Sequence, residues 1–287
     1  MSSITNVEET TITSPPYQPS LPFRQPTKLG KKVVMFPVKS GNNTYQLEGF
    51  LSSVEPSHNS NISPEGVESP LSDIGIVITH PHPMLGGNYQ NNVVLGVASY
   101  LTNHMHLPTL CFNFRGVGKS EGRGSWRGSY EQEDTLAAVR YLINEAPLQR
   151  RPKRVIIIGY SYGSVIGASV ADMDDAIMAY AAISYPFGPL TLMLLGHLLD
   201  AAKSKKPKFF VIGDRDDFTG LARFRARIEE FPDPLESRIF VNVDHFYGGA
   251  EKQLAKELSG WINSLVFPTP TPVSLDSNNE EQKQQQS

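Results

Sequence analysis

Four apolar runs constrain the fold of this chain more than any other feature of its sequence. They read IGIVITH (74–80), PTLCFNFR (108–115), RVIIIGY (154–160) and KFFVIGD (208–214). A strand with one face in water alternates polar and apolar residues, whereas a strand buried on both faces is apolar almost throughout. The four runs therefore predict a parallel sheet that is covered by helices on both sides.

Four further runs complete the predicted sheet, and helical patterns separate most of the strands. The additional strands read KKVVMFPV (31–38), TYQLEGFLSS (44–53), AIMAYAAIS (176–184) and RIFVNVDH (238–245). Helices are predicted at 91–104, 130–146, 163–172, 219–230 and 249–266. The first two strands follow each other without a helix, which indicates an antiparallel start. We predict one α/β domain with a mostly parallel, eight-stranded sheet.

Both ends of the chain are polar. Residues 1–28 are rich in Ser, Thr and Pro without an apolar period, and residues 267–287 are low in complexity. Neither segment has the apolar side chains that offset chain entropy, so we predict two disordered tails around a domain at 29–266. The polar stretch at 55–70 predicts a long surface loop.

The composition argues against several classes of protein. A formal net charge of −3 gives no general basic field for binding nucleic acid or acidic lipid. No apolar run approaches the ~20 residues of a membrane span, and no basic start precedes an apolar signal core. The single cysteine, Cys111, lies inside an apolar run, so we expect no disulfide framework, a reducing compartment and a cytoplasmic protein.

The stretch GYSYG (159–163) follows a predicted strand and precedes a helix of small residues. A serine between two glycines in this context matches the G-x-S-x-G nucleophile elbow, where a sharp turn raises the hydroxyl above the end of the strand. A serine needs a base, and the base needs an acid that orients it. Two later strands end on such groups: His245, and an acidic cluster at 214–217.

Five motifs together carry a family resemblance: HPHPMLGG, FNFRGVGKSEG, GYSYGS, GDRDDF and DHFYGG. They resemble compact serine hydrolases of the α/β-hydrolase superfamily, over roughly Lys31 to Val266. The resemblance implies an enzyme that cleaves an ester, thioester or amide of a small acyl substrate through an acyl-enzyme, with no cofactor. Two alternatives remain: a binding protein on the same fold, or a serine peptidase.

The resemblance also implies roles for individual residues. Ser161 is the expected nucleophile and His245 the base. The acid of this superfamily commonly follows the strand-closing glycine by three residues, which points from Gly213 to Asp216, with Asp214 and Asp217 as alternatives. Asp244 is an awkward partner because it is adjacent to the histidine.

The oxyanion hole is expected to use two backbone N–H groups, one of which belongs to the residue after the nucleophile, Tyr162. The second comes from the loop after the third strand, where Pro81 and Pro83 have no N–H and leave His82 as the donor. His80 is interpreted as a residue that braces this loop. A metal site at His80 and His82 is not predicted, because no third ligand has a suitable spacing.

Two other segments require interpretation. The sequence NFRGVGKS (113–120) ends like a P-loop, but asparagine stands where the first glycine is required, so nucleotide binding is not predicted. Residues 188–206 lie where many superfamily members carry a large lid. Their length predicts a minimal lid of one or two short helices, either packed into the domain or forming an apolar wall for an acyl group.

Overall fold

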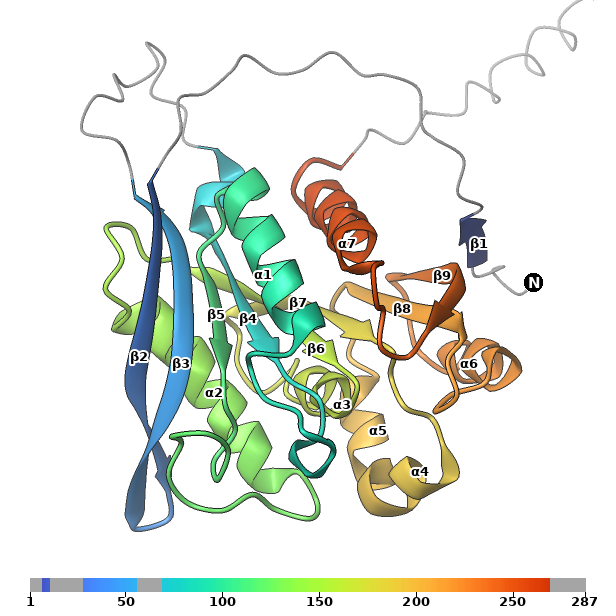
Figure 1. The fold of residues 1–287 in the computed structure, drawn as a ribbon, viewed down its shortest axis with the longest axis horizontal. Coiled ribbons are helices and arrows are strands. Elements are labelled where there is room, and N and C mark those ends of the chain that lie inside the picture. The colour runs from blue at the N-terminus through green and yellow to red at the C-terminus, as the bar shows by residue number, and fades with distance from the viewer. Residues whose placement is uncertain (1–6, 11–27, 56–68, 269–287) are drawn as a thin grey trace, which may run out of the picture.

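The structure is a computed structural model that describes residues 7–10, 28–55 and 69–268 (Figure 1). Its strands form one nine-stranded sheet in the order β1-β9-β8-β7-β6-β4-β5-β3-β2. The strands are β1 (Val7–Thr10), β2 (Lys28–Ser40), β3 (Asn43–Glu55), β4 (Ile74–Thr79), β5 (Thr109–Phe112), β6 (Arg154–Tyr160), β7 (Ile177–Ile183), β8 (Lys208–Arg215) and β9 (Leu235–Asp244). The antiparallel pairs are β2 with β3 and β3 with β5, and the other neighbours are parallel.

Strands β2 to β9 are the eight strands that the sequence predicts, and their order confirms the antiparallel start and the parallel remainder. Strand β1 is additional. Residues 7–10, which the sequence assigned to a disordered tail, instead pair in parallel with β9, with Val7 opposite Ser237. Backbone hydrogen bonds on a sheet edge need no apolar period, so the pattern contained no signal for this strand. The rest of the predicted tails and loop lies largely outside the described residues.

Helices cover both faces of the sheet. The α-helices are α1 (Asn92–Met105), α2 (Ser129–Asn144), α3 (Tyr162–Ser169), α4 (Pro189–Leu195), α5 (Leu199–Ala202), α6 (Leu221–Ile228) and α7 (Glu251–Val266). Short 3-10 turns are η1 (Pro70–Asp73), η2 (Pro83–Leu85) and η3 (Gly196–Leu198). Helices α1 and α7 pack on the face toward the viewer in Figure 1, and α2, α3 and α6 pack on the other. Among the described residues, no helix is both long and apolar enough to cross a membrane.

The central strand β6 shows why its sequence is apolar throughout. Val155 and Ile157 belong to the core beneath α2 and α3, whereas Ile156 and Ile158 belong to the core beneath α1 and α7. All four side chains are fully buried. Since successive strand residues point to opposite faces, a sheet with two covered faces needs apolar residues at every position.

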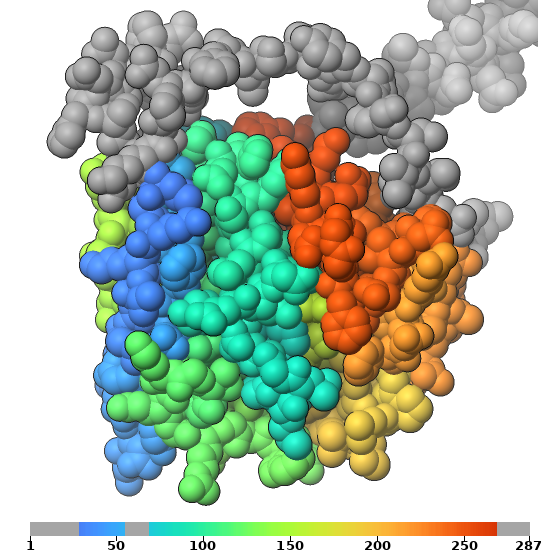
Figure 2. Space-filling view, viewed as in Figure 1, coloured from blue at the N-terminus to red at the C-terminus, as the bar shows by residue number. Residues whose placement is uncertain are grey.

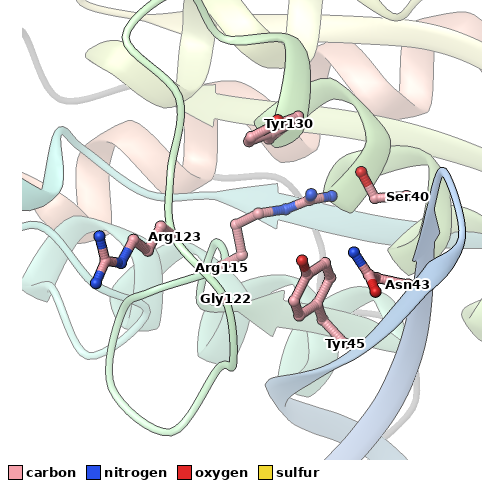
Figure 3. A pocket seen from close by; sticks show the side chains of 7 residues that line it. All are labelled: Ser40, Asn43, Tyr45, Arg115, Gly122, Arg123 and Tyr130. Atoms are coloured by element: carbon pink, nitrogen blue, oxygen red, sulfur yellow. The ribbon is translucent and has the colours of Figure 1, made fainter.

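A buried ion cluster ties the segment after β5 to α2. The Arg115 guanidinium is 2.6 Å from a carboxylate oxygen of Asp134 and 2.9 Å from one of Glu133. It also lies 4.7 Å from the ring centre of Tyr130, and Figure 3 shows it between the rings of Tyr130 and Tyr45. Burial raises the pKa of Asp134 to about 6 despite the adjacent guanidinium. These contacts fit a structural role for Arg115.

We predict that Arg115→Met lowers the free energy of unfolding by about 3–5 kcal/mol at pH 8, because the ionised Asp134 is left buried without its main partner. Urea denaturation measures the effect. The double variant Arg115→Met/Asp134→Leu removes both charges and should recover most of the loss. A double variant as unstable as the single one would contradict this explanation.

Candidate active site

The sequence between β6 and α3 folds into a strained turn with Ser161 at its apex. Ser161 has φ +54° and ψ −122°, a conformation that residues with a side chain rarely adopt. Its N–H donates to the carbonyl of Ile183 in β7 at 2.9 Å, and its carbonyl accepts from the Ser164 N–H at 2.9 Å and the Ser164 hydroxyl at 2.6 Å. The turn is therefore held at both ends, and Ser161 stands beside the N-terminus of α3.

The two glycines of the motif permit close backbone contacts. A Cβ on Gly159 would lie 2.4 Å from the carbonyl oxygen of Gly163, where the chain folds back on itself. A Cβ on Gly163 would lie 2.6 Å from the carbonyl oxygens of Thr79 and His80 at the end of β4. Contacts this short leave no room for a side chain, so the motif requires glycine at both positions.

The structure brings Ser161, His245 and Asp216 together at the carboxyl edge of the sheet. The His245 Nε2 is 3.0 Å from the Ser161 Oγ, and its Nδ1 is 2.8 Å from the Asp216 Oδ2. The three residues follow β6, β9 and β8, and all are buried, with exposed fractions of 8%, 4% and 4%. This is the geometry of a Ser–His–Asp triad.

The surroundings of Asp216 keep it ionised. Burial raises its pKa, but hydrogen bonding by His245, Ser184 and the Thr219 N–H outweighs burial and leaves the pKa below its usual value. The second carboxylate oxygen accepts from the Phe218 N–H at 2.9 Å and the Thr219 N–H at 3.1 Å. A carboxylate held in this way can fix the orientation of the imidazole and stabilise its charged form.

The other acids that the sequence offered are placed differently. Asp217 is exposed, and the Oδ1 of Asp214 is buried without a hydrogen-bond partner among the described residues. Asp244 accepts from the Phe246 N–H at 2.9 Å and stabilises the turn after β9. Asp216 is therefore the acid whose position matches the prediction.

Three polar residues that the sequence analysis did not single out support this arrangement. The Tyr160 hydroxyl donates to the backbone carbonyl of His245 at 2.7 Å and holds the histidine turn against the end of β6. The Ser184 hydroxyl lies 3.1 Å from the Tyr247 hydroxyl, and Ser184 also hydrogen-bonds Asp216. The partners lie between 32 and 85 positions apart in the chain, so no local motif marks them.

The two expected oxyanion donors lie beside the serine turn. Tyr162 is the first residue of α3, where backbone N–H groups have no partner within the helix. His82 caps η2: its carbonyl accepts from the N–H groups of Leu85 and Gly87 at 3.0 and 3.1 Å. The rings of His82 and Tyr162 are in edge contact, with centroids 4.6 Å apart. The loop after β4 is thus packed against the start of α3.

His80 braces this loop from inside the protein. Its Nε2 accepts from the Phe114 N–H at 3.1 Å, and its Nδ1 lies 2.6 Å from the Pro81 carbonyl, which assigns the proton to Nδ1. Burial lowers its pKa to about 4, so the ring is neutral at pH 7. Within the described residues, no group of three or more His, Cys, Asp and Glu side chains could hold a metal ion.

The predicted lid segment forms α4, η3 and α5, and its apolar side chains divide into a buried set and an exposed set. Leu195 and Leu198 pack into the core, with exposed fractions of 6% and 5%. Leu190, Met193 and Leu194 point away from the core, and Met193 is 73% exposed.

A separate polar cavity of about 410 Å³ lies beside Arg115, Arg123 and Tyr130 (Figure 3), and none of the three triad residues lines it.

Comparison with known proteins agrees with the fold. A family model described as an alpha/beta hydrolase domain matches residues 85–263. The chain belongs to this family. An uncharacterised protein of Rickettsia prowazekii is 26% identical over 202 residues, which are 69% of this chain and 81% of the relative.

Solved structures resemble this chain over most of its length. An alpha-beta serine hydrolase homologue from Coxiella burnetii is 28% identical, with a TM-score of 0.60, covering 78% of this chain and 95% of its own. A serine hydrolase without a lid from Xanthomonas campestris is 18% identical, with a TM-score of 0.63 and coverages of 86% and 100%. A Pyrococcus furiosus esterase is 17% identical, with a TM-score of 0.61 and coverages of 82% and 92%. The last two share the fold.

We predict that His80 makes the protein less stable as the pH falls from 6.5 to about 4. The folded state holds the pKa of His80 near 4, so the unfolded chain binds the proton first, and the free energy of unfolding falls across this window. The difference in pKa corresponds to roughly 3 kcal/mol. The side chain of His80→Gln cannot titrate. In urea denaturation at several pH values, the decrease in the free energy of unfolding between pH 6.5 and 4 should therefore be smaller for this variant than for the wild type, by about this amount.

Asp134 makes the opposite contribution, because its raised pKa favours the folded state at low pH. Both the wild type and His80→Gln contain Asp134, so its contribution cancels when the two are compared. Above pH 7.5, the free energies of unfolding of the two proteins should change with pH in parallel. Equal slopes between pH 6.5 and 4 would contradict a neutral, buried His80.

Proposed function

We propose that this protein is a serine hydrolase that cleaves a carboxylic ester or thioester through an acyl-enzyme. The observation that carries the proposal is the His245 ring, whose two nitrogens contact the Ser161 hydroxyl at 3.0 Å and the Asp216 carboxylate at 2.8 Å. A structural role for a buried histidine does not require a serine on one side and a carboxylate on the other. The single buried cysteine fits a cytoplasmic enzyme.

In the proposed reaction, the Ser161 Oγ attacks the carbonyl carbon while His245 Nε2 takes the hydroxyl proton. Asp216 keeps the Nδ1–H of His245 directed away from the serine and stabilises the imidazolium that forms. When the tetrahedral intermediate collapses, the proton passes from Nε2 to the leaving group, and an acyl ester remains on Ser161. Water, activated by the same nitrogen, then releases the acid and restores the hydroxyl.

The negative charge of each tetrahedral intermediate needs donors that are already in place. We assign this role to the backbone N–H groups of Tyr162 and His82, because donors fixed before the reaction stabilise the developing charge without reorganisation. Pro81 and Pro83 restrict the backbone on both sides of His82, and the ring contact with Tyr162 holds the two donor segments together. The serine hydrolase homologue and the esterase among the similar structures support the same class of reaction.

We expect a fluorophosphonate probe to label the wild-type protein covalently and to leave Ser161→Ala unlabelled, because the probe bonds to an activated serine oxygen. Labelling is measured by in-gel fluorescence, and circular dichroism checks that the variant is folded. Ser259→Ala is a suitable control because this serine lies in α7 and its hydroxyl donates to the Lys256 carbonyl, so labelling should be unchanged. Persistent labelling of Ser161→Ala would identify another nucleophile.

For Asp216→Asn we expect kcat on a short-chain p-nitrophenyl ester to fall by about 10⁴-fold, because the amide no longer holds the correct tautomer of His245. Asp217→Asn, a change of the same chemistry at the next, exposed position, should retain activity within about threefold. If Asp217→Asn were the inactive variant, the assignment of the acid would be wrong.

A further inference from the structure

Large apolar side chains are exposed on the segments around Ser161, and we call six of them the apolar rim. They are Met84, Trp126, Leu190, Met193, Phe218 and Phe246, with exposed fractions between 42% and 73%. Each lies in a segment that follows the carboxyl end of a parallel strand, so all six occupy the edge of the sheet that carries Ser161. In Figure 1 and Figure 2, the η2 loop, the loop before α2 and α4 lie together along the lower edge of the molecule.

Contacts connect the rim to the candidate catalytic residues. The Phe218 ring lies over the His245 ring with centroids 4.2 Å apart, and the Phe246 ring contacts it at 5.7 Å. Met84 follows His82 by two residues, and its N–H donates to the His82 ring at 3.1 Å. The rim therefore begins where the acyl group of a substrate would bind.

The lid segment and the loop before α2 extend the rim on the other side. A Cβ on Gly188, just before α4, would touch the Phe218 carbonyl oxygen at 3.0 Å, which places the start of α4 beside Phe218. A Cβ on Gly128 would meet Leu198 and Leu195 at 2.9 and 3.6 Å, so the loop that carries Trp126 lies against the lid segment. Met193 and Trp126 thus belong to neighbouring segments.

The charges beside Trp126 indicate what covers the rim. Lys119, Arg123 and Arg127 are exposed on the same loop, which carries one exposed acid, Glu121. The acidic side chain of Glu131 is turned inward, where it accepts from the Ser125 N–H at 2.9 Å and from the Ser125 hydroxyl at 2.6 Å. An exposed tryptophan among cations is typical of proteins that bind the surface of an anionic lipid layer.

We propose that the apolar rim docks on the surface of an anionic lipid layer, and that the substrate is a long-chain acyl ester drawn from that layer. This inference rests on the proposed hydrolase function and names its substrate class. Docking moves the six side chains from water into the interface, and the basic side chains contact lipid phosphates. Asp217, exposed next to Phe218, opposes docking at that end, so Trp126, Met193 and Leu190 make the deeper contact.

The chain provides its own reporter for docking. It has two tryptophans: Trp126 is 73% exposed, whereas Trp261 is 4% exposed and stacks on Phe209. Ser161→Ala protein, which should not turn over substrate, is mixed with phosphatidylcholine vesicles with and without phosphatidylglycerol. We expect its fluorescence to shift to the blue with the anionic vesicles and the protein to sediment with them. Trp126→Phe should remove the fluorescence shift.

Matched variants test the residues involved. In the Ser161→Ala background, Met193→Ser should weaken sedimentation by about tenfold. Met173→Ser changes an equally apolar methionine, 53% exposed beyond α3 at the opposite edge of the sheet, and should leave sedimentation unchanged. Arg123→Gln/Arg127→Gln should weaken binding to the anionic vesicles and reduce its dependence on salt.

The outcomes separate this inference from the proposed function. Fluorophosphonate labelling of wild-type protein without vesicle binding would overturn the inference and leave the hydrolase intact. Vesicle binding without labelling would support docking and contradict the hydrolase. A Trp126 shift that appears without vesicles as protein concentration rises, together with a dimer on size exclusion, would identify a second copy as the occupant and overturn the inference. Equal binding by Met193→Ser and Met173→Ser would also overturn it.

Discussion

The rest of the site depends on the close contact of three backbone segments at the serine turn. Gly159 lies against Gly163, and Gly163 lies against the end of β4, at separations that leave no space for a Cβ. The Thr79 hydroxyl donates to the Gly163 carbonyl at 2.8 Å and joins the same segments. This packing forces the chain from β6 into α3 so abruptly that Ser161 takes a positive φ. Backbone packing from the buried sheet therefore maintains the strain at Ser161.

The same contact places the parts of the site relative to one another. Gly163 touches Thr79 and His80, so the loop that carries His82 starts next to the helix that carries Tyr162. His80 then fixes that loop to the segment after β5 through the Phe114 N–H. A change at His80 reaches the site through these contacts, although the ring itself does not touch Ser161. The neutral, buried imidazole thus acts as a positioning group.

Periodicity and motif spacing were sufficient to predict most of the fold and to single out Ser161 and His245 as candidates, whereas the choice of Asp216 came from the family resemblance. Continuous apolar runs correspond to β4, β5, β6 and β8 because those strands are buried on both faces. Spacing alone could not choose among Asp214, Asp216 and Asp217, since the direction of each side chain after β8 depends on how the turn meets Thr219. Tyr160, Ser184 and Tyr247 escaped detection for a related reason. Each acts through a partner distant in sequence, and a buried polar residue has no periodic pattern of its own.

The exposed apolar side chains and the buried polar ones occupy the same edge of the sheet, and one physical requirement explains both. The imidazole and the carboxylate need a dry, fixed setting in which their hydrogen bonds are strong, so Asp216 and His245 lie beneath the surface. Phe218 covers His245 from outside at 4.2 Å and helps to exclude water from it. In the proposed reaction, an acyl substrate must pass this layer without rehydrating the site. Apolar side chains at the entrance let the substrate displace water as it enters, so the arrangement that keeps the triad dry also favours apolar substrates.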